Sequence, residues 1–147
     1  MALEYILRIA TDLKPPQVLD FLARTLQFEV EPDSSLSGPG LTIAASVESK
    51  LGQSIISEAF HFNPTVRVTF RLDKFDDTDA GRLSLLRGTL ELVRQLKSDA
   101  VLLFNGEDVV LLHANGELVL NEQNGFWTAE HLSQIDLPYQ MRALESL

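Results

Sequence analysis

Three histidines are the side chains of this sequence that could most readily bind a metal ion or move a proton near neutral pH. His61, His113 and His131 lie far apart in the chain, in segments of different predicted structure. None belongs to a helical pair of ligands or to a motif such as H-E-x-x-H, which places two imidazoles on one side of a helix. We therefore expect ordinary surface or half-buried histidines, with neither a metal centre nor a catalytic triad.

A cluster of aspartates offers a second candidate, a cation site. Its members are Asp73, Asp76, Asp77 and Asp79. The cluster lacks the glycine and the closing glutamate of a calcium-binding loop. It stands at the start of a predicted helix, where carboxylates accept hydrogen bonds from free N–H groups and oppose the positive end of the helix dipole. Helix capping is therefore the interpretation that we favour.

Sequence signatures of nucleotide binding and of covalent catalysis are missing. The glycines follow neither the G-x-G-x-x-G nor the G-x-x-x-x-G-K-[ST] order, and no serine stands in a G-x-S-x-G motif. The absence of cysteine excludes disulfides, thiolate nucleophiles and cysteine–zinc sites, and it suits a reducing compartment. We expect no catalytic residue, no cofactor and no metal, and hence a protein that is not an enzyme.

Two arginines and a tryptophan remain as candidate contacts with a ligand or a partner. Arg67 and Arg71 alternate with apolar residues in a predicted strand, so both lie on its polar side. They could hold an anion, but we favour pairing with carboxylates on neighbouring strands. Trp127, next to Phe126, could anchor a partner, although we favour packing on the sheet.

Acidic residues are concentrated in the last third of the chain. The net charge is −9, and residues 1–97 contain 13 acidic and 11 basic side chains, whereas residues 98–147 contain 8 acidic side chains and one basic one, Arg142. Such a surface repels phosphate backbones and anionic lipids, so we expect neither nucleic acid nor a membrane as the partner. A basic protein is favoured if the partner is charged. The alternative is that the carboxylates only keep the protein soluble.

The length and the hydropathy of the chain limit its organisation. At 147 residues it has the size of one domain, and we expect a single domain over residues 1–147. No apolar run approaches the roughly 18 residues of a membrane-spanning helix. Glu4, Arg8 and Asp12 interrupt the apolar core that a signal peptide would need, so we expect the protein in the cytoplasm.

An amphipathic segment, residues 78–97, is predicted to be the main helix. Its large aliphatic side chains fall on one broad arc: Leu83, Leu85, Leu86, Leu90, Leu92, Val93 and Leu96. A surface helix does not need so much apolar area, so a sheet must lie beneath it. The apolar spacing predicts a second helix over residues 15–27.

Alternating patterns predict the strands of that sheet. They cover residues 3–10, 41–47 and 66–72, and residues 29–40 are predicted to cross the surface as a loop. Residues 49–62 fit either a short helix or the second strand of a hairpin, and the sequence leaves both open.

Residues 100–104, 109–113 and 117–121 are predicted to form a three-stranded antiparallel meander. The dipeptides Asn105–Gly106 and Asn115–Gly116 separate them and supply the positive φ angles of tight hairpins. Pairing through two-residue turns gives two apolar faces, Leu102, Val109, Leu111, Leu118 and Leu120 on one, and Val101, Leu103, Val110, Leu112 and Val119 on the other. The main helix can cover one face. The sequence does not decide whether the other is covered by the first helix, by the tail after residue 121 or by a partner.

Together these elements predict an α+β fold with a mainly antiparallel sheet and two main helices. Their order along the chain is β-α-β-(β or α)-β-α-β-β-β.

Four stretches spread over most of the chain carry a likeness to a known family. They are the opening MALEY, residues 62–74 (FNPTVRVTFRLDK), residues 99–127 with GELVLNE at 116–122, and LPY at 137–139. They resemble the Sit-type immunity proteins of bacterial swarming-inhibition systems, which are polymorphic toxin systems. The resemblance implies a small cytoplasmic protein that binds and neutralises a toxin exchanged between sibling cells. It supplies no catalytic residue and no contact residue.

The charge distribution suggests where such a toxin would bind. Our hypothesis is that the carboxylates of the meander region contribute to the contact with a basic toxin: Asp99, Glu107, Asp108, Glu117 and Glu122. One alternative is an interaction or regulatory module without a toxin, which could form a homodimer through whichever sheet face is left apolar. The other is a small-ligand-binding protein or an enzyme, with Arg67, Arg71 and His61 in a pocket between the sheet and the helices.

Overall fold

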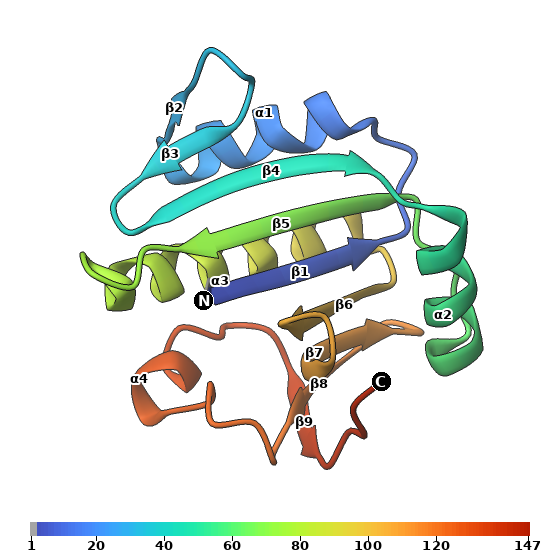
Figure 1. The fold of residues 1–147 in the computed structure, drawn as a ribbon. Helices are drawn as coiled ribbons and strands as arrows, with labels where there is room; N and C mark the ends of the chain where they lie inside the picture. Colours follow the sequence, from blue (N-terminus) through green and yellow to red (C-terminus); the bar gives the residue numbers. More distant parts are fainter. Residues whose placement is uncertain (1–2) are drawn as a thin grey trace.

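Nine strands form one sheet in the computed structural model, which describes residues 3–147 (Figure 1). Their order across the sheet is β2-β3-β4-β5-β1-β6-β7-β8-β9, and only the β8–β9 pair is parallel. The strands are β1 (Leu3–Ile9), β2 (Glu29–Val30), β3 (Leu36–Gly38), β4 (Leu41–Val47), β5 (Val66–Leu72), β6 (Ala100–Phe104), β7 (Asp108–Ala114), β8 (Glu117–Asn121) and β9 (Tyr139–Arg142). The predicted α+β class with a mainly antiparallel sheet is confirmed.

The helices are α1 (Pro15–Leu26), α2 (Lys50–Phe60), α3 (Thr78–Leu96) and the short α4 (Ala129–Leu132). None of the helices in the described part of the chain is long and apolar enough to cross a membrane. The two main helices predicted from the sequence correspond to α1 and α3. The short elements β2, β3, α4 and β9 were not predicted.

Both main helices cover the same face of the sheet, the one turned away from the viewer in Figure 1. The core between the layers contains fully buried side chains from both, among them Leu7, Val68 and Phe70 of the strands and Leu22, Leu85 and Leu86 of the helices. At Gly88 of α3, an added Cβ would lie 3.0 Å from Leu22 Cδ2. The missing side chain therefore lets α1 pack closely against α3.

The start of α3 differs from the capping interpretation. Asp77 is the N-cap residue, but its side chain accepts no hydrogen bond there, and its backbone is left-handed with φ 53°. The Asp77 carbonyl packs against Gly40, where an added Cβ would lie 2.0 Å from it. Asp73 instead stabilises the preceding turn by accepting from the Phe75 amide at 2.9 Å. The predicted cap is wrong for Asp77, because tight packing on the β3–β4 connection fixes its backbone.

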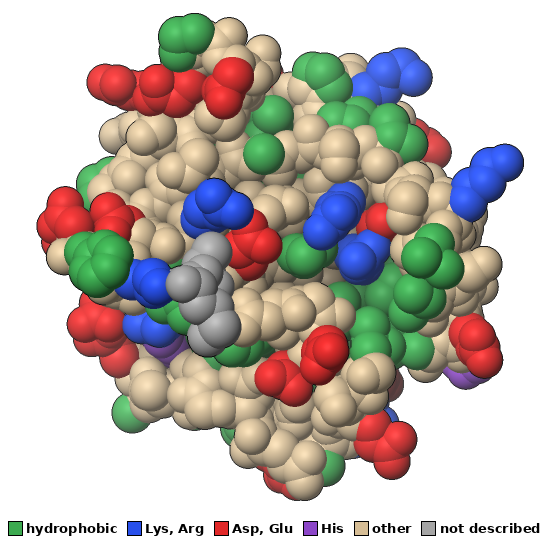
Figure 2. Space-filling view, in the orientation of Figure 1, with side chains coloured by type: hydrophobic (Ala, Val, Ile, Leu, Met, Phe, Trp, Pro, Cys, Tyr) green, Lys and Arg blue, Asp and Glu red, His purple; other side chains and the backbone are tan. Residues whose placement is uncertain are grey.

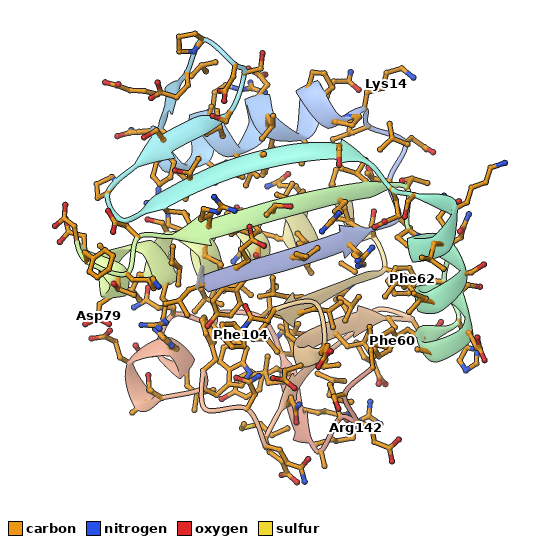
Figure 3. All side chains as sticks on the ribbon, in the orientation of Figure 1. Lys14, Phe60, Phe62, Asp79, Phe104 and Arg142 are labelled. Atoms are coloured by element: carbon orange, nitrogen blue, oxygen red, sulfur yellow. The ribbon has the colours of Figure 1, made fainter. Side chains whose placement is uncertain are left out.

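The segment that the sequence left open between helix and strand is α2. Ser49 caps this helix, since its hydroxyl oxygen accepts from the Gly52 amide at 3.0 Å. The fully buried Ile56 and the buried Phe62 pack on β6, which secures the helix to the sheet. Figure 3 shows Phe60 and Phe62 at the end of α2 beside the meander strands.

A β-bulge changes the register expected for the meander. Leu102 pairs with Leu111 and Leu103 pairs with Val109, which leaves Val110 as an extra residue in β7. As a result Val110 packs in the main core, and Val109 packs with the cluster around α2. The predicted faces are wrong for these two valines, because an extra residue exchanges the faces of its neighbours. The two Asn-Gly dipeptides do adopt the predicted positive φ angles.

The chain itself covers both faces of the meander. On one face Phe126 and Trp127 pack on the main core, and the Trp127 indole N–H donates to the Val110 carbonyl at 2.8 Å. The other face is covered by α2 and by Leu144 of the tail. The predicted packing of Trp127 on the sheet is confirmed. The second face is covered mainly by α2, which was not among the covers that the sequence offered, with Leu144 of the tail beside it.

A buried ion pair joins the sheet to α2. Arg8 Nη1 lies 2.6 Å from Glu48 Oε1, and only 1% of the Glu48 side chain is exposed. The same carboxylate oxygen accepts from the Ser49 amide at 3.0 Å. An added Cβ at Gly52 would lie 2.2 Å from Glu48 Oε1 and 2.5 Å from Arg8 Nη1. The first turn of α2 therefore packs directly on the pair.

Replacement of Glu48 by alanine should lower the free energy of unfolding by about 3–5 kcal/mol, because Arg8 would keep a largely buried charge without its partner. Urea unfolding of the two proteins measures the difference. The matched control Asp20→Ala removes the exposed Arg24–Asp20 pair, and its cost should be below about 1 kcal/mol. Equal losses in both variants would contradict a structural role for the buried pair.

Candidate functional site

Among the described residues, no helix covers the second face of the sheet over β4, β5 and β1. In Figure 1 these strands lie in front of α1 and α3, with α2 at one end. The outward side chains form three rows across the strands, which we call the open face: Thr42, Arg71 and Glu4; Ala44, Thr69 and Ile6; Ser46, Arg67 and Arg8. Most of these side chains are polar or small, which suits a face without a helical cover.

Three guanidinium groups lie on the open face, and Figure 2 shows basic side chains gathered over the middle of the sheet. Arg71 Nη2 lies 2.9 Å from Glu4 Oε2 on the neighbouring strand. The predicted pairing with a carboxylate is therefore confirmed for Arg71. Arg67 lies directly opposite Arg8, which is another cation, and it forms no ion pair within residues 3–147. The predicted pairing is wrong for Arg67.

Arg67 also lacks a hydrogen-bond acceptor. Its Nε atom is buried and has no partner among the described residues, and the same holds for Arg8 Nε and Glu48 Oε2. The other oxygen of Glu48 is already bound by Arg8 and by the Ser49 amide. A buried donor without an acceptor costs about 1–3 kcal/mol. Because this Nε is buried, an external group would have to meet the exposed part of the half-buried Arg67 side chain.

The carboxylates predicted to contact a partner divide between the two ends of the meander. Glu107 and Asp108 lie at the β6–β7 connection, and Glu122 follows β8 at the same end. Asp99 and Glu117 lie at the other end, where Asp99 Oδ1 accepts from the Asn115 amide at 3.3 Å. The length of β7, about 20 Å, separates the two groups. We call them the turn cluster (Glu107, Asp108, Glu122) and the far cluster (Asp99, Glu117).

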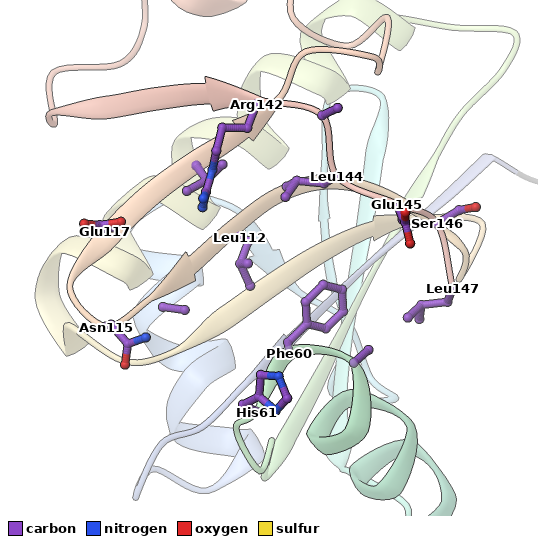
Figure 4. Close-up of a pocket in the computed structure, with 14 residues that line it drawn as sticks. Phe60, His61, Leu112, Asn115, Glu117, Arg142, Leu144, Glu145, Ser146 and Leu147 are labelled. Carbon is purple, nitrogen blue, oxygen red and sulfur yellow. The ribbon is translucent and has the colours of Figure 1, made fainter.

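A groove of about 630 Å³ runs between the end of α2 and the C-terminal tail (Figure 4). Its lining is part apolar and part charged, with Phe60, Leu112, Leu144, His61, Glu117 and Arg142 among its residues. Arg67 and Arg71 do not line it. This groove therefore does not bring the two arginines together with His61, as the small-ligand alternative required.

Asn121 holds the tail that forms one wall of the groove. Its buried Nδ2 donates to the Val109 carbonyl at 2.8 Å and to the Leu144 carbonyl at 3.1 Å. Its Oδ1 accepts from the Leu144 amide at 3.1 Å and from the Gln123 amide at 3.0 Å. One side chain thus anchors both the start of β7 and the end of the chain.

The histidines lie apart. The expected surface or half-buried position is wrong for His113 and His131, which are buried, and right for the exposed His61. His113 Nδ1 lies 2.7 Å from the Ser98 carbonyl, and the buried His131 ring stacks on Phe126 with a centroid distance of 4.4 Å. His61 ends α2 in a left-handed conformation. Within residues 3–147 no three histidine, aspartate or glutamate side chains are arranged to hold a metal ion.

Comparison with protein families adds what the geometry alone does not give. A profile of the family described as SitI3-like matches residues 3–131. The chain belongs to the SitI3-like family. The resemblance to Sit-type immunity proteins is thereby confirmed. No curated protein and no solved structure gave a significant match.

The SitI3-like match includes some of these surfaces and leaves out others. The open face, α2 and both carboxylate clusters lie within residues 3–131. The strand β9 and the tail wall of the groove lie beyond the match. Surfaces of the first kind are therefore better candidates for a function shared by SitI3-like proteins.

Sequence reasoning identified Arg67 and Arg71 but missed the open face as a surface. The signal was present, because Glu4 and Arg8 alternate with apolar residues in the first strand just as the two arginines do in β5. Combining the two patterns required the antiparallel β1–β5 pairing, which brings Arg8 opposite Arg67. This strand pairing cannot be predicted from the alternating patterns of the two strands alone.

Replacement of Asn121 by alanine should release the tail, because both hydrogen bonds between Asn121 and Leu144 would be lost. Hydrogen exchange at the Leu144 amide should accelerate, and the free energy of unfolding should fall by about 1–3 kcal/mol, because the Val109 carbonyl loses its closer donor and keeps only Asn124 Nδ2 at 3.4 Å. The control is the exposed neighbour, Gln123→Ala. Unchanged protection of Leu144 in the Asn121 variant would show that the tail is held by other contacts.

Proposed function

We propose that this SitI3-like protein is an immunity protein that binds and neutralises a cognate toxin exchanged between sibling bacterial cells. The observation that carries the proposal is the family match over residues 3–131. The net charge of −9 supports a basic toxin as the partner, because complementary fields accelerate association. The protein acts in the cytoplasm of the cell that receives the toxin.

Neutralisation occurs by occupation of the toxin and not by chemistry on it. A bound immunity protein blocks access to the toxin's working surface for as long as the complex lasts, so affinity and residence time decide protection. This mechanism requires a complementary surface and no catalytic side chain. It also requires at least one immunity protein for each toxin molecule.

The two carboxylate clusters contribute electrostatic attraction. Glu107, Asp108, Glu117 and Glu122 are exposed, and no carboxylate of either cluster forms an ion pair within the described chain. Their separation of about 20 Å is compatible with one binding event, since a typical interface buries about 800 Å² on each partner. Charges at the rim of an interface mainly change the association rate.

Charge reversal of the turn cluster with Glu107→Lys and Asp108→Lys should slow association with the toxin about tenfold at low ionic strength, since attraction at the rim is replaced by repulsion. Stopped-flow association measured over a range of salt concentrations tests this. The difference from wild type should shrink as salt rises, because the charges are screened.

The matched control is Glu29→Lys with Glu31→Lys, which changes the net charge equally at the opposite edge of the sheet. It separates the local effect from the effect of total charge. Equal association rates for the two double variants would remove the turn cluster from the interface.

The proposed function itself is tested with the product of the adjacent gene, which the proposal expects to be the toxin. The two proteins should co-purify, and cells that produce the toxin should grow only when this protein is also produced. Growth arrest in its presence, with no complex recovered, would refute the proposal.

A further inference from the structure

We propose that the open face, together with Leu51 and Ile55 of α2, is the surface on which the toxin docks, and that Arg67 binds a toxin carboxylate there. The inference rests on the proposed function and adds the location and chemistry of the contact. Four observations support it: the sheet surface without a helix, the unpaired guanidinium, the exposed apolar side chains of α2, and the internal contacts that fix these groups in place.

The first observation is that, within residues 3–147, neither a helix nor the tail covers the open face over β4, β5 and β1. The helices α1 and α3 pack on the other side of the sheet, and the tail covers the meander instead. The surface left exposed lies at the centre of the sheet, where β5 and β1 each have strands on both sides. A partner on this face would contact rows of side chains whose positions are fixed by the pairing of the strands.

The second observation is the charge of Arg67. The cations Arg71 and Arg8 are matched by Glu4 and Glu48, so Arg67 is the guanidinium on this face that no carboxylate of the described chain neutralises. Its Nε is buried and out of reach of a partner, but the side chain as a whole is only half-buried. A partner carboxylate at the exposed part of the guanidinium would supply the missing charge, and charge-assisted bonds to a guanidinium are among the strong ones.

The third observation is an apolar ridge on α2. Leu51 and Ile55 are four residues apart on α2, so they lie on one side of the helix, and they are 72% and 42% exposed. Figure 2 shows apolar side chains over α2 on the same face as the basic groups. Gly52, next to Leu51, packs on the Arg8–Glu48 pair, which places the first turn of α2 at the Arg8 end of the open face.

The fourth observation is that contacts within the chain hold this surface in one conformation without a partner, so it is preorganised. Glu48 fixes Arg8 at 2.6 Å, Ser49 caps α2, and Ile56 anchors the helix to the sheet. A preformed surface loses little conformational entropy on binding, which favours tight association. It also gives selectivity, because a toxin without a carboxylate at this position would bury Arg67 unpaired.

The chemistry of the occupant follows from these contacts. It is a protein segment that carries an aspartate or a glutamate next to an apolar side chain, with the carboxylate at Arg67 and the apolar group on the ridge. A toxin that is basic overall can carry such a segment. The total charge of the toxin sets the rate of association, and the single carboxylate forms the specific contact with Arg67 in the bound complex.

The test measures the affinity of four variants for the purified product of the adjacent gene by titration calorimetry. Arg67→Glu should weaken binding about 30-fold or more, because it sets two carboxylates against each other in a desolvated contact. Leu51→Asp should weaken it about tenfold. The matched controls are Lys97→Glu at the end of α3 and Val30→Asp in β2, an exposed valine at the sheet edge, and both should bind like wild type.

A charge swap tests the carboxylate itself. Among toxin variants in which single aspartates or glutamates are replaced by arginine, one should restore binding to Arg67→Glu while losing binding to wild type. Restoration by none of them would overturn the assignment of a carboxylate to Arg67. Should Arg67→Glu fail to fold, Arg67→Gln and the surface variant Leu51→Asp measure the same contact.

The outcomes separate this inference from the proposed function. If wild type binds the toxin and protects cells while Arg67→Glu and Leu51→Asp bind equally well, the docking surface is wrong and the immunity function stands. If wild type does not bind, both are overturned. If Leu51→Asp instead converts a dimer of this chain into a monomer and leaves toxin binding unchanged, the surface joins two copies and the inference fails.

Discussion

Burial of one sheet face beneath α1 and α3 is the constraint on which the rest of the structure depends. The two helices supply fully buried leucines to a core that runs under β4, β5, β1 and β6, and Gly88 lets them lie side by side. Since both are used on the same side, the chain has only α2 and its tail left for the other side, and these cover the meander. The charged side chains that point outward from the centre of the sheet must then find partners among their neighbours on the same face. The Arg71–Glu4 and Arg8–Glu48 pairs do so, whereas Arg67 has no carboxylate partner within residues 3–147.

The parts of the fold set by local pattern could be predicted from the sequence. The apolar arc of residues 78–97 gave α3, and the alternation in residues 66–72 gave β5, because both patterns reflect a single element facing a core. The failures depend on contacts between distant segments. The bulge at Val110, the left-handed Asp77 against Gly40 and the Arg8–Arg67 juxtaposition each depend on a pairing that no local pattern contains. For the same reason the five carboxylates looked like one acidic region in the sequence, and the antiparallel turns distribute them to opposite ends of β7.

The proposed mode of action divides electrostatics into two tasks. The excess of carboxylates in the last third of the chain produces a long-range field that attracts a basic protein and is screened by salt. Arg67 acts at short range and carries the opposite charge. In the proposed complex it favours a partner that places a carboxylate beside its partly desolvated guanidinium. Together the two would give fast capture and discrimination between toxins.

Stoichiometry is the most direct measure of the central claim, that this SitI3-like protein neutralises a toxin by occupying it. Toxin activity should be followed while the immunity protein is added in steps at a toxin concentration well above the dissociation constant. The account predicts a linear fall that reaches zero at a fixed ratio of small whole numbers, with active toxin recovered after the complex is denatured and the toxin refolded. The account would be contradicted if a small fraction of an equivalent inactivated all of the toxin and the toxin stayed inactive after separation. That result would show that the protein works catalytically.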